Sequence, residues 1–369
     1  IYCEKAAKFT ITNSTFIENS DKSSDAASEH SIVLIDAAVE INDTIIRSGG
    51  ERTLTCGGVY IKNQHDTDVQ IRNTHIMDTE SYNGCIYYAT TGTSTNDALF
   101  LVENCTFERC IRVAFHIAVP SESEEKVWIM DCIFTECMRK EANRPIFLVD
   151  SGSDSIDFNM TGCTLRNCGV DNDEYTGVGH TVYIDITDST VEPKYPIWFE
   201  NNTIEFDEEL QRKASNAIFF SQLGQTLYFH RCTVRRCYDR YNLFPYVNTL
   251  SASKLKKIEI SESTFDSCGI PHENLGGNVI GFTGEQPTEA IVRNCTFTKI
   301  TAAIVSYTED ITIIGNEFNN CSKNTIRISA HNGNNGVRLI ENHFHDANRG
   351  SILYSVPYSN PPYVIAQEH

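Results

Sequence analysis

The sequence predicts an all-β protein: a right-handed, single-stranded parallel β-helix of about 12 coils, with about 30 residues per coil. Three observations support this. A short motif recurs along the whole 369-residue chain, the apolar runs between its copies are short and rich in β-branched and aromatic residues, and no amphipathic helix is evident. Each repeat is too small to bury an apolar face alone, so successive repeats must stack on one another.

The recurring motif is a small polar residue or Cys, usually followed by Thr and then by an apolar residue, as in Cys105-Thr106-Phe107. Alternate side chains of a strand face opposite ways, so we expect the middle residue, the marker, to point outward and the next residue to point into the core. The markers are Thr15, Thr44, Thr74, Thr106, Ile133, Thr164, Thr203, Thr233, Thr264, Thr296, Glu317 and His343.

Stacked motifs would build a ladder of apolar side chains inside the coils. His75 interrupts the ladder, and we interpret it as a hydrogen-bonded core or edge histidine rather than as a ligand. The expected members are Phe16, Ile45, Phe107, Phe134, Leu165, Ile204, Val234, Phe265, Phe297, Phe318 and Phe344.

Two further apolar runs separate successive motifs, with a polar or glycine-containing turn between them, as in 57–61 and 69–71. Their length, composition and flanking residues are typical of strands. One coil is therefore a strand, a turn, a second strand and the motif strand. Other pairs of runs are 85–88 with 98–102, 113–117 with 127–129, 146–149 with 156–158, 182–184 with 197–199, 217–220 with 227–229, 279–282 with 290–292, and 303–305 with 311–313.

We expect one β-helix domain over residues 1–356 and a Pro-containing tail over residues 357–369. Length alone would suggest two or three globular domains, but a solenoid extends a single core. The strands at both ends of a β-helix have open edges. We therefore expect caps, or end-to-end or lateral association with another copy.

The charge of the chain restricts its partners. The net charge is −19, which argues against nucleic acid or an anionic membrane surface as the partner, since both bind positively charged protein surfaces. No run approaches the roughly 20 apolar residues of a membrane span. A protein or a glycan is the expected partner.

Eleven of the 14 cysteines fall into two columns, one directly before the marker and one four residues after it. We expect an interior ladder of buried thiols used as small apolar groups. Inter-coil disulfides and metal binding remain alternatives, although Cys-x4-Cys without His is not a zinc spacing. The first column is Cys105, Cys132, Cys163, Cys232 and Cys295, with substitutes such as Asn73 and Asn202, and the second is Cys110, Cys137, Cys168, Cys237, Cys268 and Cys321, with Asp78 as a substitute.

Seven Asn-x-Ser/Thr sequons occur, and five of them lie two residues before the marker, where we expect the Asn to face outward. They would carry glycans in a protein secreted by a eukaryote. Alternatively, the repeat itself generates the sequon. The seven are Asn13, Asn42, Asn104, Asn159, Asn201, Asn294 and Asn320.

No catalytic constellation is evident, and we assign no catalytic, cofactor-binding or metal-binding residue. β-Helix enzymes that cleave polysaccharides gather acidic residues beside a groove, whereas the acidic clusters at 122–125 and 171–174 are interpreted as solvated loops. Gly179-His180 and Arg327-Ile328 are isolated fragments of polygalacturonase motifs. A polysaccharide lyase or hydrolase is the enzymatic alternative.

The repeat resembles the polymorphic outer membrane proteins and related right-handed, pectate-lyase-like β-helix surface proteins, including those of parasitic protists. Their Phe-x-x-Asn and Gly-Gly-Ala-Ile motifs are matched by Phe16-Ile17-Glu18-Asn19 and approximated by Gly57-Gly58-Val59-Tyr60. Segments 107–110, 134–137, 265–268 and 318–321 are Phe-x-x-Cys variants. The resemblance implies adhesion or surface display, with no catalytic residues to transfer.

We therefore expect a non-enzymatic structural or adhesive scaffold, at the cell surface or outside the cell. It would engage a protein or glycan along one face or through protruding loops, for which 171–175, 188–194 and 207–213 are candidates. The remaining alternative is a component of a large filamentous or cytoskeletal assembly inside the cell.

Overall fold

The structure is a computed structural model that describes most of the strands and their adjoining turns. The described residues are 1–17, 30–47, 57–63, 67–81, 84–90, 98–112, 114–119, 124–137, 147–151, 155–169, 180–186, 195–208, 216–222, 226–237, 248–253, 256–268, 278–282, 289–300, 302–306, 310–321, 325–329, 336–346, 352–355 and 364–367.

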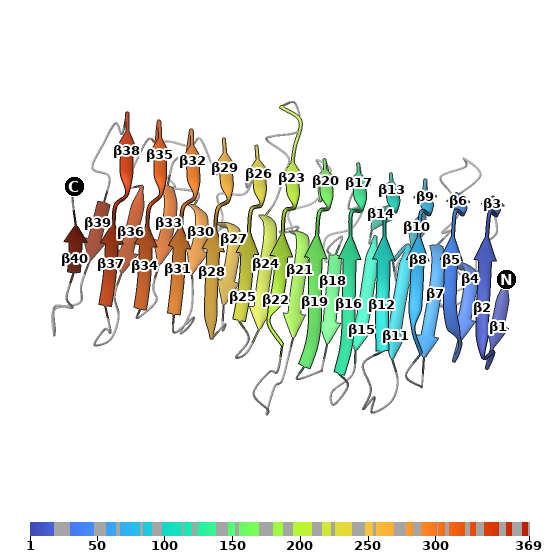
Figure 1. Cartoon of the computed structure of the whole chain (residues 1–369). Helices are drawn as coiled ribbons and strands as arrows, with labels where there is room; N and C mark the ends of the chain where they lie inside the picture. The colour runs from blue at the N-terminus through green and yellow to red at the C-terminus, as the bar shows by residue number, and fades with distance from the viewer. Residues whose placement is uncertain are drawn as a thin grey trace. The chain divides into compact units, whose positions relative to one another are not determined.

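Two compact units divide the chain, residues 1–195 and 196–369. In each unit the described strands form three sheets in which every neighbouring pair is parallel, as Figure 1 shows. The third sheet of each unit has six strands, so each unit makes about six turns of roughly 30 residues. The predicted all-β parallel solenoid is confirmed. The prediction of about 12 coils was for the whole chain, and about six turns lie in each unit.

The first unit contains seven strands in its first sheet, six in its second and six in its third. The first sheet is β1 (Tyr2–Glu4), β4 (His30–Ile35), β7 (Gly57–Asn63), β11 (Ile86–Thr90), β15 (Phe115–Val119), β18 (Phe147–Ser151) and β21 (His180–Ile186). The second is β2 (Lys8–Thr12), β5 (Ala38–Asn42), β8 (Val69–Arg72), β12 (Ala98–Glu103), β16 (Glu124–Met130) and β19 (Ser155–Thr161). The third is β3 (Thr15–Ile17), β6 (Ile45–Arg47), β9 (His75–Met77), β13 (Thr106–Glu108), β17 (Ile133–Thr135) and β20 (Thr164–Arg166). Two short strands, β10 (Glu80–Ser81) and β14 (Ile111–Arg112), pair separately.

The second unit repeats this order of strands. Its first sheet is β24 (Asn216–Gln222), β27 (Asn248–Ser253), β30 (Asn278–Phe282), β33 (Ala302–Ser306), β36 (Ile326–Ser329) and β39 (Ile352–Ser355). Its second is β22 (Ile197–Glu200), β25 (Thr226–His230), β28 (Lys257–Ser261), β31 (Glu289–Arg293), β34 (Asp310–Ile314), β37 (Gly336–Ile340) and β40 (Val364–Gln367). Its third is β23 (Thr203–Glu205), β26 (Thr233–Arg235), β29 (Thr264–Asp266), β32 (Thr296–Thr298), β35 (Glu317–Asn319) and β38 (His343–His345).

Two features bear on the expected chain organisation. Strand β40 lies within the range 357–369, which the sequence predicted to be a tail, and it pairs with β37. In the part of the chain that the structure describes, no helix is long and apolar enough to cross a membrane.

The apolar ladder forms along the third sheet, and stacked phenylalanines are its main component. In the first unit the rings of Phe107 and Phe134 are 4.7 Å apart and nearly parallel. In the second unit Phe297 lies between Phe265, at 5.2 Å, and Phe318, at 5.0 Å. All five rings are buried, so their burial and stacking hold successive coils together.

Two coils of the first unit use a different register from the expected one. Phe16 pairs with Ile46, Ile46 pairs with Ile76, and Ile76 pairs with Phe107. Ile46 and Ile76 are fully buried. They, and not the residues one position earlier, continue the apolar ladder.

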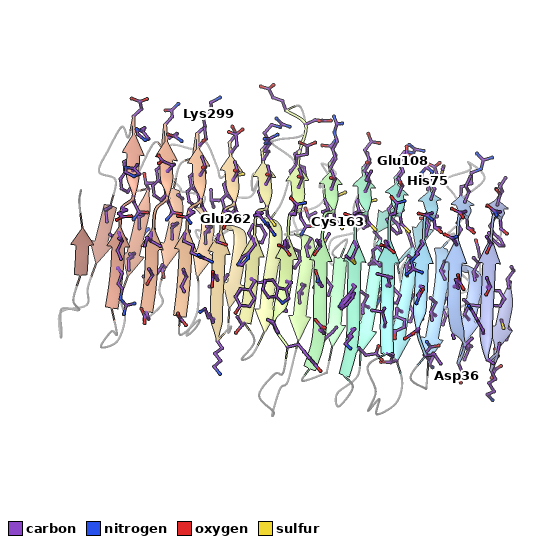
Figure 2. The ribbon with its side chains drawn as sticks, in the orientation of Figure 1. Asp36, His75, Glu108, Cys163, Glu262 and Lys299 are labelled. Atoms are coloured by element: carbon purple, nitrogen blue, oxygen red, sulfur yellow. The ribbon has the colours of Figure 1, made fainter. Side chains whose placement is uncertain are left out.

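The predicted inward positions of Ile45 and His75 were therefore wrong. Ile45 is 40% exposed, and His75 lies on the outer side of its strand, with Nε2 3.3 Å from Glu108 Oε2 (Figure 2). The motif is shifted by one residue because Thr44 and Thr74 occupy the buried place that Cys takes in other coils. Their hydroxyl groups donate to the carbonyl oxygen two residues earlier, at 3.0 and 2.8 Å.

A left-handed backbone conformation precedes each motif strand and explains why the motif begins after Asn or Asp in many coils. Asn104, for example, has φ 52°, and its N–H donates to the Met130 carbonyl of the next coil at 3.0 Å. Asn and Asp tolerate this conformation better than most residues. Residues of this kind are Asn13, Asp43, Asn73, Asn104, Asp131 and Gly162 in the first unit, and Asn201, Arg231, Glu262, Asn294, Gly315 and Glu341 in the second.

Candidate binding surface

The predicted cysteine ladder lies inside the coils, at the corners before and after the motif strand. All 11 side chains are buried. They are Cys105, Cys132, Cys163, Cys232 and Cys295 in the first column, and Cys110, Cys137, Cys168, Cys237, Cys268 and Cys321 in the second.

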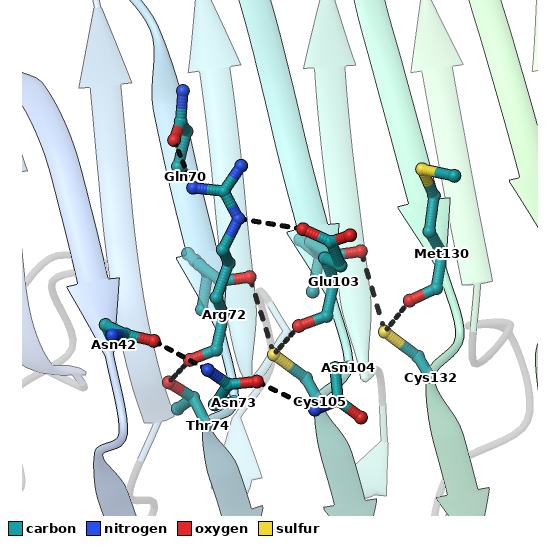
Figure 3. A network of polar contacts seen from close by, with 12 residues as sticks. Asn42, Gln70, Arg72, Asn73, Thr74, Glu103, Asn104, Cys105, Met130 and Cys132 are labelled. Atoms are coloured by element: carbon teal, nitrogen blue, oxygen red, sulfur yellow. Dashed lines mark hydrogen bonds and ion pairs between the residues drawn. The ribbon is translucent and has the colours of Figure 1, made fainter.

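Hydrogen bonding explains the residue types of the first column. The thiols of Cys105 and Cys132 donate to the carbonyl oxygen two residues earlier, at 3.3 and 3.2 Å (Figure 3). Ser263 makes the same bond at 2.8 Å. Burial raises the pKa of Cys232 and of Cys295 to about 12, so these thiols stay protonated and can donate.

Two of the expected substitutes in these columns lie elsewhere. Asn73 and Asp78 are exposed corner residues with positive φ, and the buried places belong to Thr74 and Thr79. This correction has the same cause as the one for Ile45 and His75, because the motif of this coil is shifted by one residue.

The sequons occupy two kinds of position. Asn42 and Asn159 lie on strands of the second sheet and are half-buried. Asn42 Oδ1 accepts a hydrogen bond from Asn73 at 2.9 Å, and Asn73 in turn accepts one from Asn104 at 2.7 Å (Figure 3). The sequons exposed at positive-φ corners are Asn13, Asn104, Asn201, Asn294 and Asn320.

An aromatic cluster lies on the outer side of the second sheet in the second unit. Trp198 on β22 and Tyr228 on β25 are register partners, and their rings stack with centroids 4.2 Å apart. His230 packs edge-on to both rings, at 5.6 and 5.5 Å. Both stacked side chains are half-buried, so part of each ring meets solvent.

Charged residues surround this cluster as cross-coil pairs. Arg293 binds Glu259 through Nε at 2.8 Å and Nη2 at 2.6 Å, and Arg231 pairs with Glu200. His230 Nε2 lies 3.8 Å from the same Glu259 carboxylate. The Glu259 carboxylate thus binds one guanidinium group and lies near the His230 ring.

We call Trp198, Tyr228, His230, Glu259 and Arg293 the aromatic–arginine face. Sequence reasoning did not identify it, although 197–199 and 227–229 show the signal: each run places one aromatic residue between two buried apolar ones. Alternation therefore predicts that Trp198 and Tyr228 point outward. That they meet follows only from the register of the two strands.

A smaller aromatic cluster lies on the first sheet of the first unit. The rings of Tyr60 and Tyr87 stack at 4.7 Å, and His116 packs edge-on to Tyr87 at 4.9 Å. These two ring contacts join only Tyr and His side chains. The pair is a matched comparison for the aromatic–arginine face.

The acidic segment 122–125 differs from the expected solvated loop. Glu125 is 2% exposed and accepts a hydrogen bond from the buried Tyr88 hydroxyl at 2.8 Å, so this part of the prediction was wrong. The cluster at 171–174, the loops at 171–175 and 188–194, and residues 209–213 of the third candidate loop lie outside the described residues. Among the residues that the structure does describe, no three His, Cys, Asp or Glu side chains gather to hold a metal ion.

Comparison with known proteins adds no relative. No protein-family model, no curated protein and no solved structure matches the chain. A functional proposal therefore depends on the geometry of the aromatic–arginine face.

Proposed function

We propose that the protein is a non-enzymatic, adhesive β-helix scaffold, at the cell surface or outside the cell, and that it binds a protein partner through the aromatic–arginine face. The observation that carries the proposal is the stacked pair Trp198–Tyr228, whose neighbour in the register, Glu259, binds Arg293. Trp, Tyr and Arg are the residue types that most often dominate the binding energy of protein interfaces.

The ring geometry favours a protein over a glycan. Trp198 and Tyr228 each cover one face of the other, and His230 packs edge-on to both, so at most one face of each ring is left for a sugar to stack on. The stacking of the two rings and the Arg293–Glu259 ion pair restrict these side chains before binding, which reduces the entropy lost on association. The net charge of −19 favours a partner with a basic rim.

Binding of the purified chain to immobilised extracellular-matrix proteins and to a glycan array, measured by biolayer interferometry, tests this proposal. We expect binding to a matrix protein, and we expect Trp198→Ala to weaken it by about 30-fold or more, the effect of losing about 2 kcal/mol at an interface hot spot. Tyr87→Ala, in the smaller aromatic cluster, is the matched control and should bind like the wild type.

Three outcomes would contradict the proposal. The first is equal affinity of Trp198→Ala and wild type for the bound protein. The second is binding to glycans alone, which would replace the protein partner with a glycan. The third is cleavage of a glycan on the array, which would support the enzymatic alternative.

A further inference from the structure

Three consecutive coils of the first unit carry Cys at both inner corners. Their motif strands β13, β17 and β20 pair residue to residue, Thr106 with Ile133 and Ile133 with Thr164. The cysteines directly before these residues therefore stack without an intervening side chain. These stacks are Cys105, Cys132 and Cys163 before the strand, and Cys110, Cys137 and Cys168 after it.

The spacing of the coils determines what two stacked thiols can share. Neighbouring parallel strands lie about 4.8 Å apart, and equivalent atoms of stacked residues repeat at about this distance. Two collinear metal–sulfur bonds, each about 2.3 Å as for zinc and sulfur, span about 4.6 Å. A disulfide needs Cβ atoms about 3.8 Å apart, which is clearly shorter than the strand spacing. The geometry is thus closer to a metal bridge than to a disulfide.

The second unit contains a natural contrast. In its first column Ser263 lies between Cys232 and Cys295, since Thr233, Thr264 and Thr296 pair in order. The two thiols are therefore about two strand spacings, or about 9.6 Å, apart. They cannot share one ion.

We propose that directly stacked thiols, those of the first unit and the pair Cys237–Cys268 of the second, bind soft monovalent cations of the Cu(I) class, each ion held between two neighbouring sulfurs. Soft thiolate ligands select such ions. The ion bonds to the thiolate of one Cys and to a sulfur lone pair of its neighbour, which keeps its proton. One proton leaves to solvent for each ion bound, so the charge of the buried site does not change, and no unpaired charge is buried.

Silver(I), which is stable in air, is the probe for the test. The reduced full-length chain is incubated with silver nitrate, then with excess glutathione to remove silver from isolated thiols, and the retained ions are counted by native mass spectrometry. We expect the wild type to retain silver. Cys132→Ser should retain less, because it separates Cys105 from Cys163, and Ser263→Cys should retain more, because it joins Cys232 to Cys295.

Both substitutions introduce a residue type that already occurs in this column, so the fold tolerates them. Cys321→Ser is the matched control: it removes one buried thiol that Ile300 separates from Cys268, and it should leave the retained silver unchanged.

Because one proton is released per ion, silver affinity should rise tenfold per pH unit below the thiol pKa. Equal retention by wild type, Cys132→Ser and Ser263→Cys would overturn the proposal, as would equal losses in Cys132→Ser and Cys321→Ser.

Discussion

Replacing Phe134 with Ala should lower the free energy of unfolding by about 3–5 kcal/mol, the range for a buried Phe that leaves a cavity. Phe134 is fully buried and stacks on Phe107 at 4.7 Å. It also packs edge-on against Phe115 at 5.8 Å. The substitution therefore removes contacts between coils as well as within one coil. Guanidinium unfolding of the variant and the wild type, followed by circular dichroism, measures the difference.

The neighbouring residue supplies the control for this prediction. Ile133 lies on the same strand but is 48% exposed. Ile133→Ala should change the free energy of unfolding by no more than about 0.5 kcal/mol, as most surface substitutions do. Similar losses in Phe134→Ala and Ile133→Ala would show that this strand does not direct Phe134 inward.

Replacing Gly58 with Ala should destabilise the protein by about 1–3 kcal/mol, the usual cost of overpacking a tight site. A Cβ atom on Gly58 would lie 2.5 Å from the carbonyl oxygen of Cys85 on the next coil. That oxygen accepts hydrogen bonds from the N–H groups of Gly58, at 3.1 Å, and Val59, at 2.8 Å. It is a backbone atom, so the two strands must move apart to make room.

Lys62 on the same strand is the comparison for Gly58. It is half-buried and lies on the outer side of β7, so Lys62→Ala should change the free energy of unfolding by no more than about 0.5 kcal/mol. The same unfolding experiment measures both variants. If Gly58→Ala is as stable as Lys62→Ala, the close approach of the two strands is wrong. The same result tests whether this close approach is the reason for the Gly at position 58.

The period of the motif was sufficient to predict the fold, because stacking requires only that each coil place its apolar residues at equivalent positions. It was not sufficient for the exact register. In 44–46 and 74–76 a Thr is followed by two residues, either of which could be the inward one. The Thr itself therefore fits either the outward marker position or the inward position that Cys takes in other coils. Only the pairing of Phe16 with Ile46 decides between the two.

The candidate binding surface depends on contacts that alternation does not determine. The pattern of β22 and β25 indicates that Trp198 and Tyr228 face outward, but turns of variable length separate the strands, so the sequence does not show that the rings stack. Glu125 shows a different limit of the sequence pattern: a side chain expected to be exposed is buried. An acidic run was expected to be solvated, whereas the hydroxyl group of Tyr88 allows one carboxylate to lie inside the coils.

The apolar ladder, the thiol stacks and the aromatic–arginine face all follow from the register in which the strands of neighbouring coils pair. The most direct test compares Ile46→Ala with Ile45→Ala by guanidinium unfolding. Ile46 is fully buried and Ile45 is 40% exposed. The structure predicts a loss of about 2–5 kcal/mol for Ile46→Ala and at most about 0.5 kcal/mol for Ile45→Ala. A larger loss for Ile45→Ala would contradict the register.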